Sequence, residues 1–194
     1  MSTQPLKLKE HFFKNLAPAL KKELGVKNVW AVPRLTKVKL NVGLGSFIAA
    51  KKDYSEVVDN LAAITGQKPV VTKARMAISN FKIKQHQPVG VTVTLRGKKM
   101  YDFISKLVNI TFPRVRDFRG ISPKGFDGHG NYTVGIVENT VFPEINPDNI
   151  DKIYGLEVTI VTTAKDDASG KKLLEAFGFP FQKIKEKKAK EKLS

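Results

Sequence analysis

Apolar and polar residues alternate along the chain in a way that predicts a β-sheet. The clearest runs cover residues 36–42 and 89–96, where every second residue is apolar. Alternation of this kind places one set of side chains against a core and the other set outward. Strand patterns recur at residues 132–138 and 156–163, and the stretch 69–72 begins with a proline that suits an edge strand. We therefore expect four or five strands.

Apolar residues at helical spacing predict helices between and after these strands. The expected helices cover residues 6–24, 51–64, 98–110 and 168–177. The first of them should bury Phe12, Phe13, Leu16, Leu20 and Leu24. Gly25 and Gly66 follow two helices at the position where glycine commonly ends a helix. This order of elements predicts an α+β sandwich, with one sheet covered by helices on one face and open on the other.

Two stretches have no usable period. Residues 73–87 are basic and poorly periodic, which indicates a long loop or an irregular hairpin. Residues 112–131 are rich in Gly and Arg, and a loop of that length is usually functional or mobile. We expect residues 1–181 to form a single domain, followed by a low-complexity basic tail at 182–194.

The net charge indicates a polyanionic partner. The chain has 34 Lys and Arg against 18 Asp and Glu, which gives +16 on 194 residues. A folded protein with that charge repels itself, and a bound nucleic acid relieves the repulsion. At 41% hydrophobic residues the chain is too apolar for a disordered basic protein. The alternative is a basic protein whose charge serves solubility alone.

The outward residues of the predicted strands define the character of the open face. They are mainly Lys37, Lys39, Asn41, Thr92, Thr94, Arg96, Thr133, Gly135, Thr159 and Thr163, with Glu157 and Val161 as exceptions. No aromatic residue is among them, so this face is a poor platform for stacking bases. Short hydroxyl, amide and guanidinium groups suit the phosphates, 2′-hydroxyls and base edges of a folded RNA. The alternative is an ordinary solvated sheet face, where Thr is frequent for its β-propensity alone.

Catalytic and metal-binding patterns are weak. The chain has no Cys and three scattered His, so we expect neither a metal site nor a cofactor. The segment 41–46, NVGLGS, has turn glycines but neither phosphate-loop pattern. Asp127 and His129 are separated and followed by glycine, which favours a turn over an acid/base pair. The sequence therefore predicts a protein that is not an enzyme.

Two further basic segments stand out. Arg114, Arg116 and Arg119 offer planar forks that match phosphate groups, unless Asp117 pairs them internally, and Phe118 between them can stack or anchor. The Lys-rich tail indicates charge without fixed geometry, which RNA or a membrane surface would satisfy equally. Neither a lipidation signal nor an apolar amphipathic face accompanies the tail. No signal peptide is apparent, and no apolar run is long enough to span a bilayer. We therefore expect no membrane partner.

Seven stretches taken in order resemble the bacterial large-subunit ribosomal protein five family, from about residue 6 to residue 181. They are residues 40–45 (LNVGLG), 64–75 (ITGQKPVVTKAR), 93–97 (VTLRG), 113–120 (PRVRDFRG), 126–132 (FDGHGNY), 142–145 (FPEI) and 160–165 (IVTTAK). Each motif alone is weak, whereas seven in matching order are highly specific.

The resemblance implies an antiparallel sheet with helices on one side, an RRM-like sandwich with an open RNA-binding face. It also implies a structural component of the cytoplasmic ribosome, in the central protuberance of the large subunit. The implied partners are 5S rRNA, 23S rRNA, the P-site tRNA, a small-subunit head protein and other proteins of the central protuberance. The alternatives are a free-standing RNA-binding factor or chaperone and, third, an enzyme on a basic scaffold.

The resemblance also assigns residues. The family's RNA-contacting positions match Asn41, Gln67, Thr94 and Arg96, three of which alternation already places on the open face. The implied rRNA-binding set is thus Lys37, Lys39, Asn41, Gln67, Thr92, Thr94 and Arg96.

The implied tRNA-facing loop spans about residues 75–87 and offers Arg75, Phe81, Lys82 and Lys84, with Phe81 expected to anchor its base. Asn80 stands there where the family often has Gly. The loop with Arg114, Arg116 and Arg119 is expected at the bridge to the small subunit.

Overall fold

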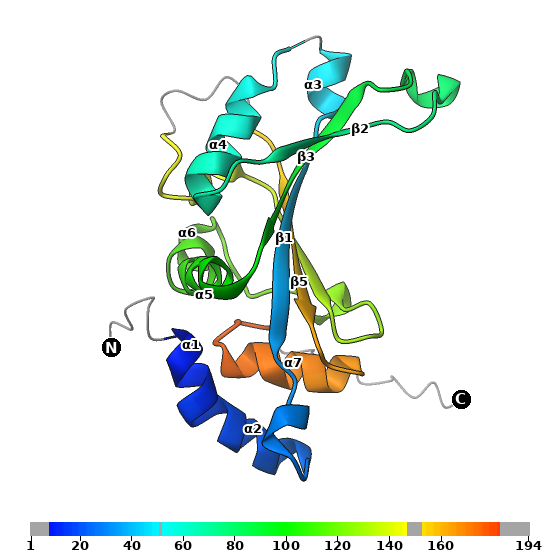
Figure 1. Cartoon of the computed structure of the whole chain (residues 1–194). Helices are drawn as coiled ribbons and strands as arrows, with labels where there is room; N and C mark the ends of the chain where they lie inside the picture. Colours follow the sequence, from blue (N-terminus) through cyan, green and yellow to red (C-terminus); the bar gives the residue numbers. More distant parts are fainter. Residues whose placement is uncertain (1–7, 51, 147–152, 183–194) are drawn as a thin grey trace, which may run out of the picture.

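A computed structural model of the chain describes residues 8–50, 52–146 and 153–182. Five strands form one antiparallel sheet in the order β2-β3-β1-β5-β4, with helices packed behind it (Figure 1). The strands are β1 (Leu35–Gly43), β2 (Val70–Lys73), β3 (Pro88–Leu95), β4 (Tyr132–Ile136) and β5 (Leu156–Thr162). The predicted α+β sandwich with an open face is confirmed, and β2 lies at the edge as expected. All but the first residue of the predicted tail lie outside the described residues.

Strand β1 is the centre of the sheet. It pairs with β3 on one side and with β5 on the other. Its apolar set, Val38, Leu40 and Val42, is at most 1% exposed. Each of these side chains faces the helices, and its register partners on the neighbouring strands, such as Val93 and Val158 opposite Leu40, are buried as well. The alternation read from the sequence therefore corresponds to the two faces of the sheet.

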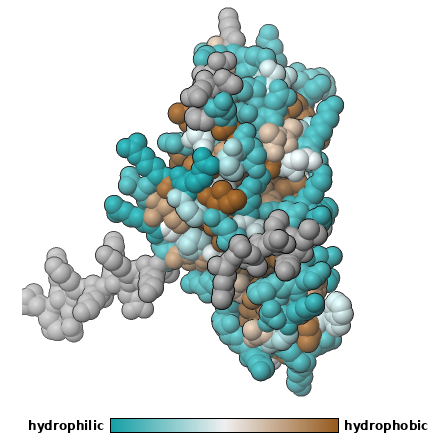
Figure 2. Space-filling view, turned by 90° about the vertical axis from the view of Figure 1, so that its left-hand side faces the viewer, coloured by the Kyte–Doolittle hydropathy of each residue, from teal (hydrophilic) through white to brown (hydrophobic). Residues whose placement is uncertain are grey.

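The helices gather on one side of the sheet (Figure 1). They are α1 (Leu8–His11), α2 (Ala17–Leu24), α3 (Gly45–Ala49), α4 (Ser55–Thr65), α5 (Gly97–Lys106), α6 (Phe112–Arg114) and α7 (Asp167–Ala176). Apolar groups show between hydrophilic ones on this side of the molecule (Figure 2). No helix in the described ranges combines the length and apolar character that a membrane crossing requires.

Two helices widen by one residue just before a proline. A π-helical turn at Phe12–Leu16 joins α1 to α2 and precedes Pro18, and a second at Leu107–Thr111 joins α5 to α6 and precedes Pro113. Proline has no backbone N–H and its ring clashes with the carbonyl four residues back. The wider turn accommodates that clash without ending the helix.

Three local predictions were wrong. Phe13 is 43% exposed instead of buried, because it lies beyond the end of the sheet, beside Phe12. The helix expected from residue 51 begins at Ser55, after Asp53 Oδ1 accepts hydrogen bonds from the backbone N–H groups of Tyr54 and Ser55. Val89 is only half-buried, and it is the second residue of β3, at the end of the strand where the hairpin arm leaves the sheet.

The segment 112–131 is folded, which corrects the expectation of a structureless loop. Phe112 stacks on Phe118 with ring centroids 5.4 Å apart. Ile121 is buried and pairs with Phe181, whose ring contacts Phe126 and Tyr132. Aromatic packing between distant parts of the chain thus holds this segment where local periodicity gives no signal.

Helix α7 packs against the 126–131 turn at two glycines. A Cβ atom placed on Gly170 would lie 2.6 Å from the Gly130 carbonyl oxygen and 2.9 Å from its Cα. These are backbone atoms, which cannot swing away as a side chain would. The close approach of α7 therefore requires glycine at position 170.

We expect Gly170→Ala to destabilise the protein by about 1–3 kcal/mol, because overpacking against backbone outweighs the better helix propensity of Ala. Urea unfolding measures the change. Gly45→Ala in α3 is the matched control, since a Cβ there meets nothing within 4 Å; it should be neutral or stabilising. Equal stabilities for the two variants would contradict the packing account.

Candidate nucleic-acid interface

The open face brings most of the predicted rRNA-binding residues together. Lys39 pairs with Thr94 on one side and Thr159 on the other, and Asn41 lies between Thr92 and Glu157. Paired residues of an antiparallel sheet point to the same face. These side chains therefore form a continuous polar surface across β3, β1 and β5, on the side of the sheet that the helices leave open (Figure 1).

Hydrogen bonds fix several groups of this surface. Asn41 Nδ2 donates to Glu157 Oε2 at 3.3 Å, which orients the amide. Thr92 Oγ1 donates to the carbonyl oxygen of Leu40 at 2.9 Å. Because the Thr92 hydroxyl donates its proton in this bond, its oxygen can still accept a hydrogen bond from a ligand. The structure therefore adds Glu157 to the candidate site residues. The sequence analysis identified it only as an acidic exception among the outward residues.

Gln67 and Arg96 join this surface from outside the strands. Gln67 Nε2 donates to the carbonyl oxygen of Thr94 at 3.3 Å, which ties the loop after α4 to β3. Arg96 is extended, with φ −139° and ψ 163°, one residue past the end of β3. Gly97, at φ 58°, then turns the chain into α5. This turn requires a left-handed residue, so glycine there lets Arg96 stay at the edge of the open face.

Among the described residues, the cations of the open face have no acidic partners. Throughout the described ranges, neither Lys37, Lys39 nor Arg96 forms an ion pair; the ion pairs lie on other elements. Charges that no carboxylate neutralises attract a polyanion without first breaking a salt bridge. The face is therefore ready for phosphate groups as it stands.

Three glycines on the open face carry no side chain that would project from the sheet. Gly43 pairs with Gly90 across β1 and β3, and Gly135 on β4 pairs with Glu157. A Cβ on Gly43 or Gly135 would meet no atom within 4 Å, so these positions border open space. Flat positions of this kind let another backbone approach closely.

The 73–87 segment forms an irregular hairpin arm, as predicted. It extends β2 and β3 beyond the sheet and projects from the body of the molecule (Figure 1). Backbone hydrogen bonds join Ala74 to Gln87 and Ile78 to Ile83. Phe81 is 73% exposed near the tip, so it does not anchor the arm's base, because no part of the body lies beside it.

The tip of the arm does not need glycine at position 80. Asn80 lies in a short 3₁₀ turn, Ser79–Phe81, and the left-handed residue is Lys82, at φ 55°. The departure from the family pattern at Asn80 is thus compatible with a tight tip. Arg75, Lys82 and Lys84 leave the arm basic.

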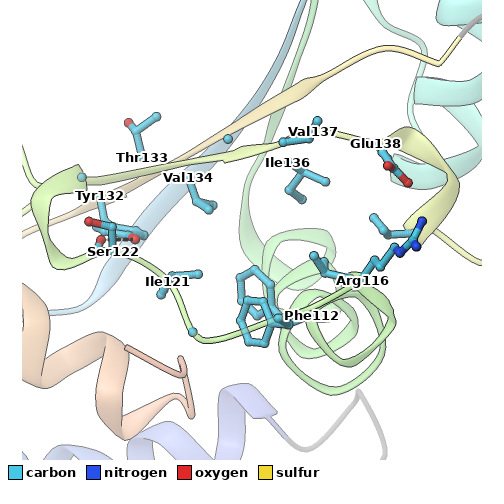
Figure 3. A pocket seen from close by; sticks show the side chains of 16 residues that line it. Phe112, Arg116, Ile121, Ser122, Tyr132, Thr133, Val134, Ile136, Val137 and Glu138 are labelled. Carbon is cyan, nitrogen blue, oxygen red and sulfur yellow. Dashed lines mark hydrogen bonds between the residues drawn. The ribbon is translucent and has the colours of Figure 1, made fainter. Parts of the chain in front are cut away.

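The segment that carries Arg114, Arg116 and Arg119 borders an apolar pocket of about 400 Å³ behind β4 (Figure 3). Val134 and Ile136 point into the pocket, while Thr133 points the opposite way. Arg116 lies at the rim, and in the described part of the chain Asp117 pairs with none of the neighbouring arginines. The internal-pairing alternative is therefore unsupported. Phe118 acts as an anchor, stacked on Phe112.

The candidate catalytic segments are structural turns. Asp127 Oδ1 accepts from the backbone N–H groups of His129 and Asn131, and Asn131 Nδ2 donates to Asp127 Oδ2 at 2.7 Å. The Asn131 side-chain bond, with the backbone bonds, lowers the pKa of Asp127 below its ordinary value, so it is a poor proton donor. Gly43 and Gly45 lead from β1 into the short helix α3. Among the residues described, no group of three possible metal ligands exists.

Fold and surface together define an α+β protein with a polar, partly basic open face of the kind that suits RNA. The family model described as ribosomal protein L5 matches residues 28–84, and the model of the L5P family C-terminus matches residues 88–181. The chain belongs to the ribosomal protein L5 family.

Curated relatives support the same family assignment. The large ribosomal subunit protein uL5 of Desulfatibacillum aliphaticivorans is 57% identical over 91% of this chain and 98% of its own length. The uL5 proteins of Geotalea uraniireducens and Thermosipho africanus are 53% and 51% identical, over 91% and 93% of this chain and 98% and 99% of their own lengths. This confirms the predicted ribosomal family, the cytoplasmic ribosome as its location and the absence of an enzymatic role. The individual rRNA-contacting residues remain predictions.

We expect Gly135→Val to fold normally and to bind ribosomal RNA more weakly. Valine suits a strand and has free space at this position, so stability should be unchanged or slightly raised. Its bulk on the open face would hold the RNA away. Urea unfolding and filter binding measure the two effects. Unchanged RNA affinity would show that the RNA does not approach β4 closely.

Proposed function

We propose that this protein is a structural component of the large ribosomal subunit that binds 5S rRNA in the central protuberance. One observation carries the proposal. Four residues match the RNA-contacting positions of the family: Asn41 and Thr94 lie on the open face, Arg96 directly follows β3, and Gln67 bonds to the Thr94 carbonyl oxygen beside that strand. Gln67 comes from the loop after α4, and its bond to the Thr94 carbonyl oxygen holds it beside β3.

The arrangement divides the face by chemistry. Lys37, Lys39 and Arg96 provide positive charge at one end of the surface, where phosphates would be attracted. Near Asn41 the carboxylate of Glu157 repels phosphates and favours groups that donate hydrogen bonds, such as 2′-hydroxyls and base amino groups. The centre of the face thus selects for sugar and base edges, and its cationic end holds the backbone.

The hairpin arm is proposed to contact the tRNA in the P site. It projects from the body, and it combines basic residues with the exposed apolar side chains of Met76 and Phe81. Exposed aromatic and cationic groups on one arm suit an RNA surface. An arm with few contacts to the core can follow a moving partner.

The remaining contacts follow from position and charge. Arg114, Arg116 and Arg119 are proposed to face the small-subunit head protein, with 23S rRNA and other central-protuberance proteins around the body. We propose one domain at residues 1–181, with the tail at 182–194 adding nonspecific attraction, since its lysines offer phosphates no fixed geometry.

We expect Arg96→Ala to weaken 5S rRNA binding by about 5- to 150-fold, since a lost Arg contact to RNA costs about 1–3 kcal/mol. Filter binding at a fixed salt concentration measures the affinity. Lys52→Ala is the control, because Lys52 is an exposed lysine on the helix side, between α3 and α4. It should change affinity little.

Equal losses of 5S rRNA affinity in Arg96→Ala and Lys52→Ala would show that the binding depends on overall positive charge and not on a specific contact of Arg96. Co-sedimentation with large subunits through a high-salt wash separates a resident protein from a free RNA-binding factor, which would wash off. Release of the wild-type chain under those conditions would contradict the structural role.

Replacing residues 76–85 by an Asn-Gly turn should leave 5S rRNA affinity intact and weaken tRNA retention in the P site. The turn closes the hairpin beyond the Ala74–Gln87 hydrogen bonds, so the sheet is preserved. Filter binding and tRNA dissociation from reconstituted ribosomes measure the two quantities. Normal tRNA retention would remove the arm from the tRNA contact; lost 5S affinity would place it in the 5S site.

A further inference from the structure

An aromatic cleft lies beyond the end of the sheet, where the chain passes from α2 into β1. Seven residues enclose about 230 Å³: Phe12, Phe13, Ala17, Val29, Trp30, Val32 and Arg34. We call this the Trp30 cleft. Trp30 is 76% exposed, and Phe13 and Val29 are 43% and 42% exposed. Large apolar side chains grouped at a surface mark an interaction site more often than single exposed ones do.

The cleft is built on fixed backbone. Asn28 Oδ1 accepts from the Trp30 backbone N–H at 3.0 Å and caps the short 3₁₀ turn Val29–Ala31. On the opposite wall Phe12 is buried and stacks on Phe177, the residue after α7, with ring centroids 5.3 Å apart. Phe13 meets Phe12 edge to face. The exposure of Trp30 is therefore a property of an ordered turn, and the cleft exists before a ligand arrives.

The cleft joins an aromatic platform to an available cation. The Arg34 backbone N–H donates to Thr163 Oγ1, and its carbonyl oxygen accepts from the Thr163 N–H, both at 3.0 Å. The Arg34 side chain forms no ion pair with any described residue. Arg34 is three residues before Lys37, so the cleft lies within about 10 Å of backbone from the cationic end of the open face. The open face itself has no aromatic side chain for a base to stack on.

We propose that the Trp30 cleft takes one unstacked nucleobase of the RNA bound by the open face. The base stacks on the Trp30 indole, and Arg34 holds the neighbouring phosphate. This inference rests on the proposed function. The net charge of +16 and the unpaired Arg34 favour RNA over a protein side chain as the occupant.

Trp30 is the one tryptophan of the chain, so its fluorescence reports directly on the cleft. Titration of 5S rRNA into the full chain should quench the emission and protect it from acrylamide. Trp30→Ala should weaken binding by about tenfold or more, whereas Trp30→Phe retains a stacking ring and most of the affinity. Ile110→Ala, an exposed apolar truncation in the π-helical turn after α5, should leave affinity unchanged. Thermal melts confirm that the variants fold.

The outcomes separate the cleft from the open face. Wild-type affinity of Trp30→Ala, with affinity lost in Arg96→Ala, would overturn the cleft and leave the proposed function standing. Wild-type affinity of both variants would remove the proposed function and the cleft with it. Emission that responds to large-subunit proteins but not to RNA would assign the cleft to a protein partner and overturn the proposal.

Discussion

The strict alternation of strand β1 is the constraint on which the rest of the structure depends. Val38, Leu40 and Val42 are completely buried at the centre of the sheet, between β3 and β5. A register shift of one residue would expose them and push Lys37 and Lys39 into the core, where unpaired charges are costly. The burial that stabilises the fold therefore also fixes the cations on the open face. The same register of β1 thus determines both the stability of the fold and the position of the cations.

The charge of the protein follows the same division. The helix side uses lysines for structure: Lys106 donates to the carbonyl oxygen of Ile64, at the end of α4, and pairs with Glu144. Among the described residues, the open face leaves Lys37, Lys39 and Arg96 without ion-pair partners, and a Cβ on Gly43 or Gly135 would meet open space. A surface of this kind gains by covering itself with a polyanion, because the self-repulsion of a +16 chain falls on binding. It needs no enclosed pocket and no catalytic group, in agreement with a structural role.

Local periodicity was sufficient to predict the five strands and most of the residues that face inward or outward, with Val89 as an exception. It failed where distant parts of the chain meet. The 112–131 segment is held by Phe112, Phe118 and Phe181, whose contacts no period encodes. The Asn41–Glu157 bond depends on the β1–β5 register, and Gln67 is held beside β3 by its bond to the Thr94 carbonyl oxygen. Phe81 and Trp30 read as ordinary apolar residues in sequence, and only their position outside the sheet makes them exposed.

Lysine reactivity, compared between the free protein and its complex with 5S rRNA, tests most directly whether the open face is the RNA-binding surface. Both states are treated with an acylating reagent, and mass spectrometry reads modification at each lysine. The account predicts that Lys37 and Lys39 become protected in the complex, while Lys52 and Lys171 on the helix side stay reactive. Protection of Lys52 and Lys171 with full reactivity of Lys37 and Lys39 would place the RNA on the wrong side of the sheet and contradict the account.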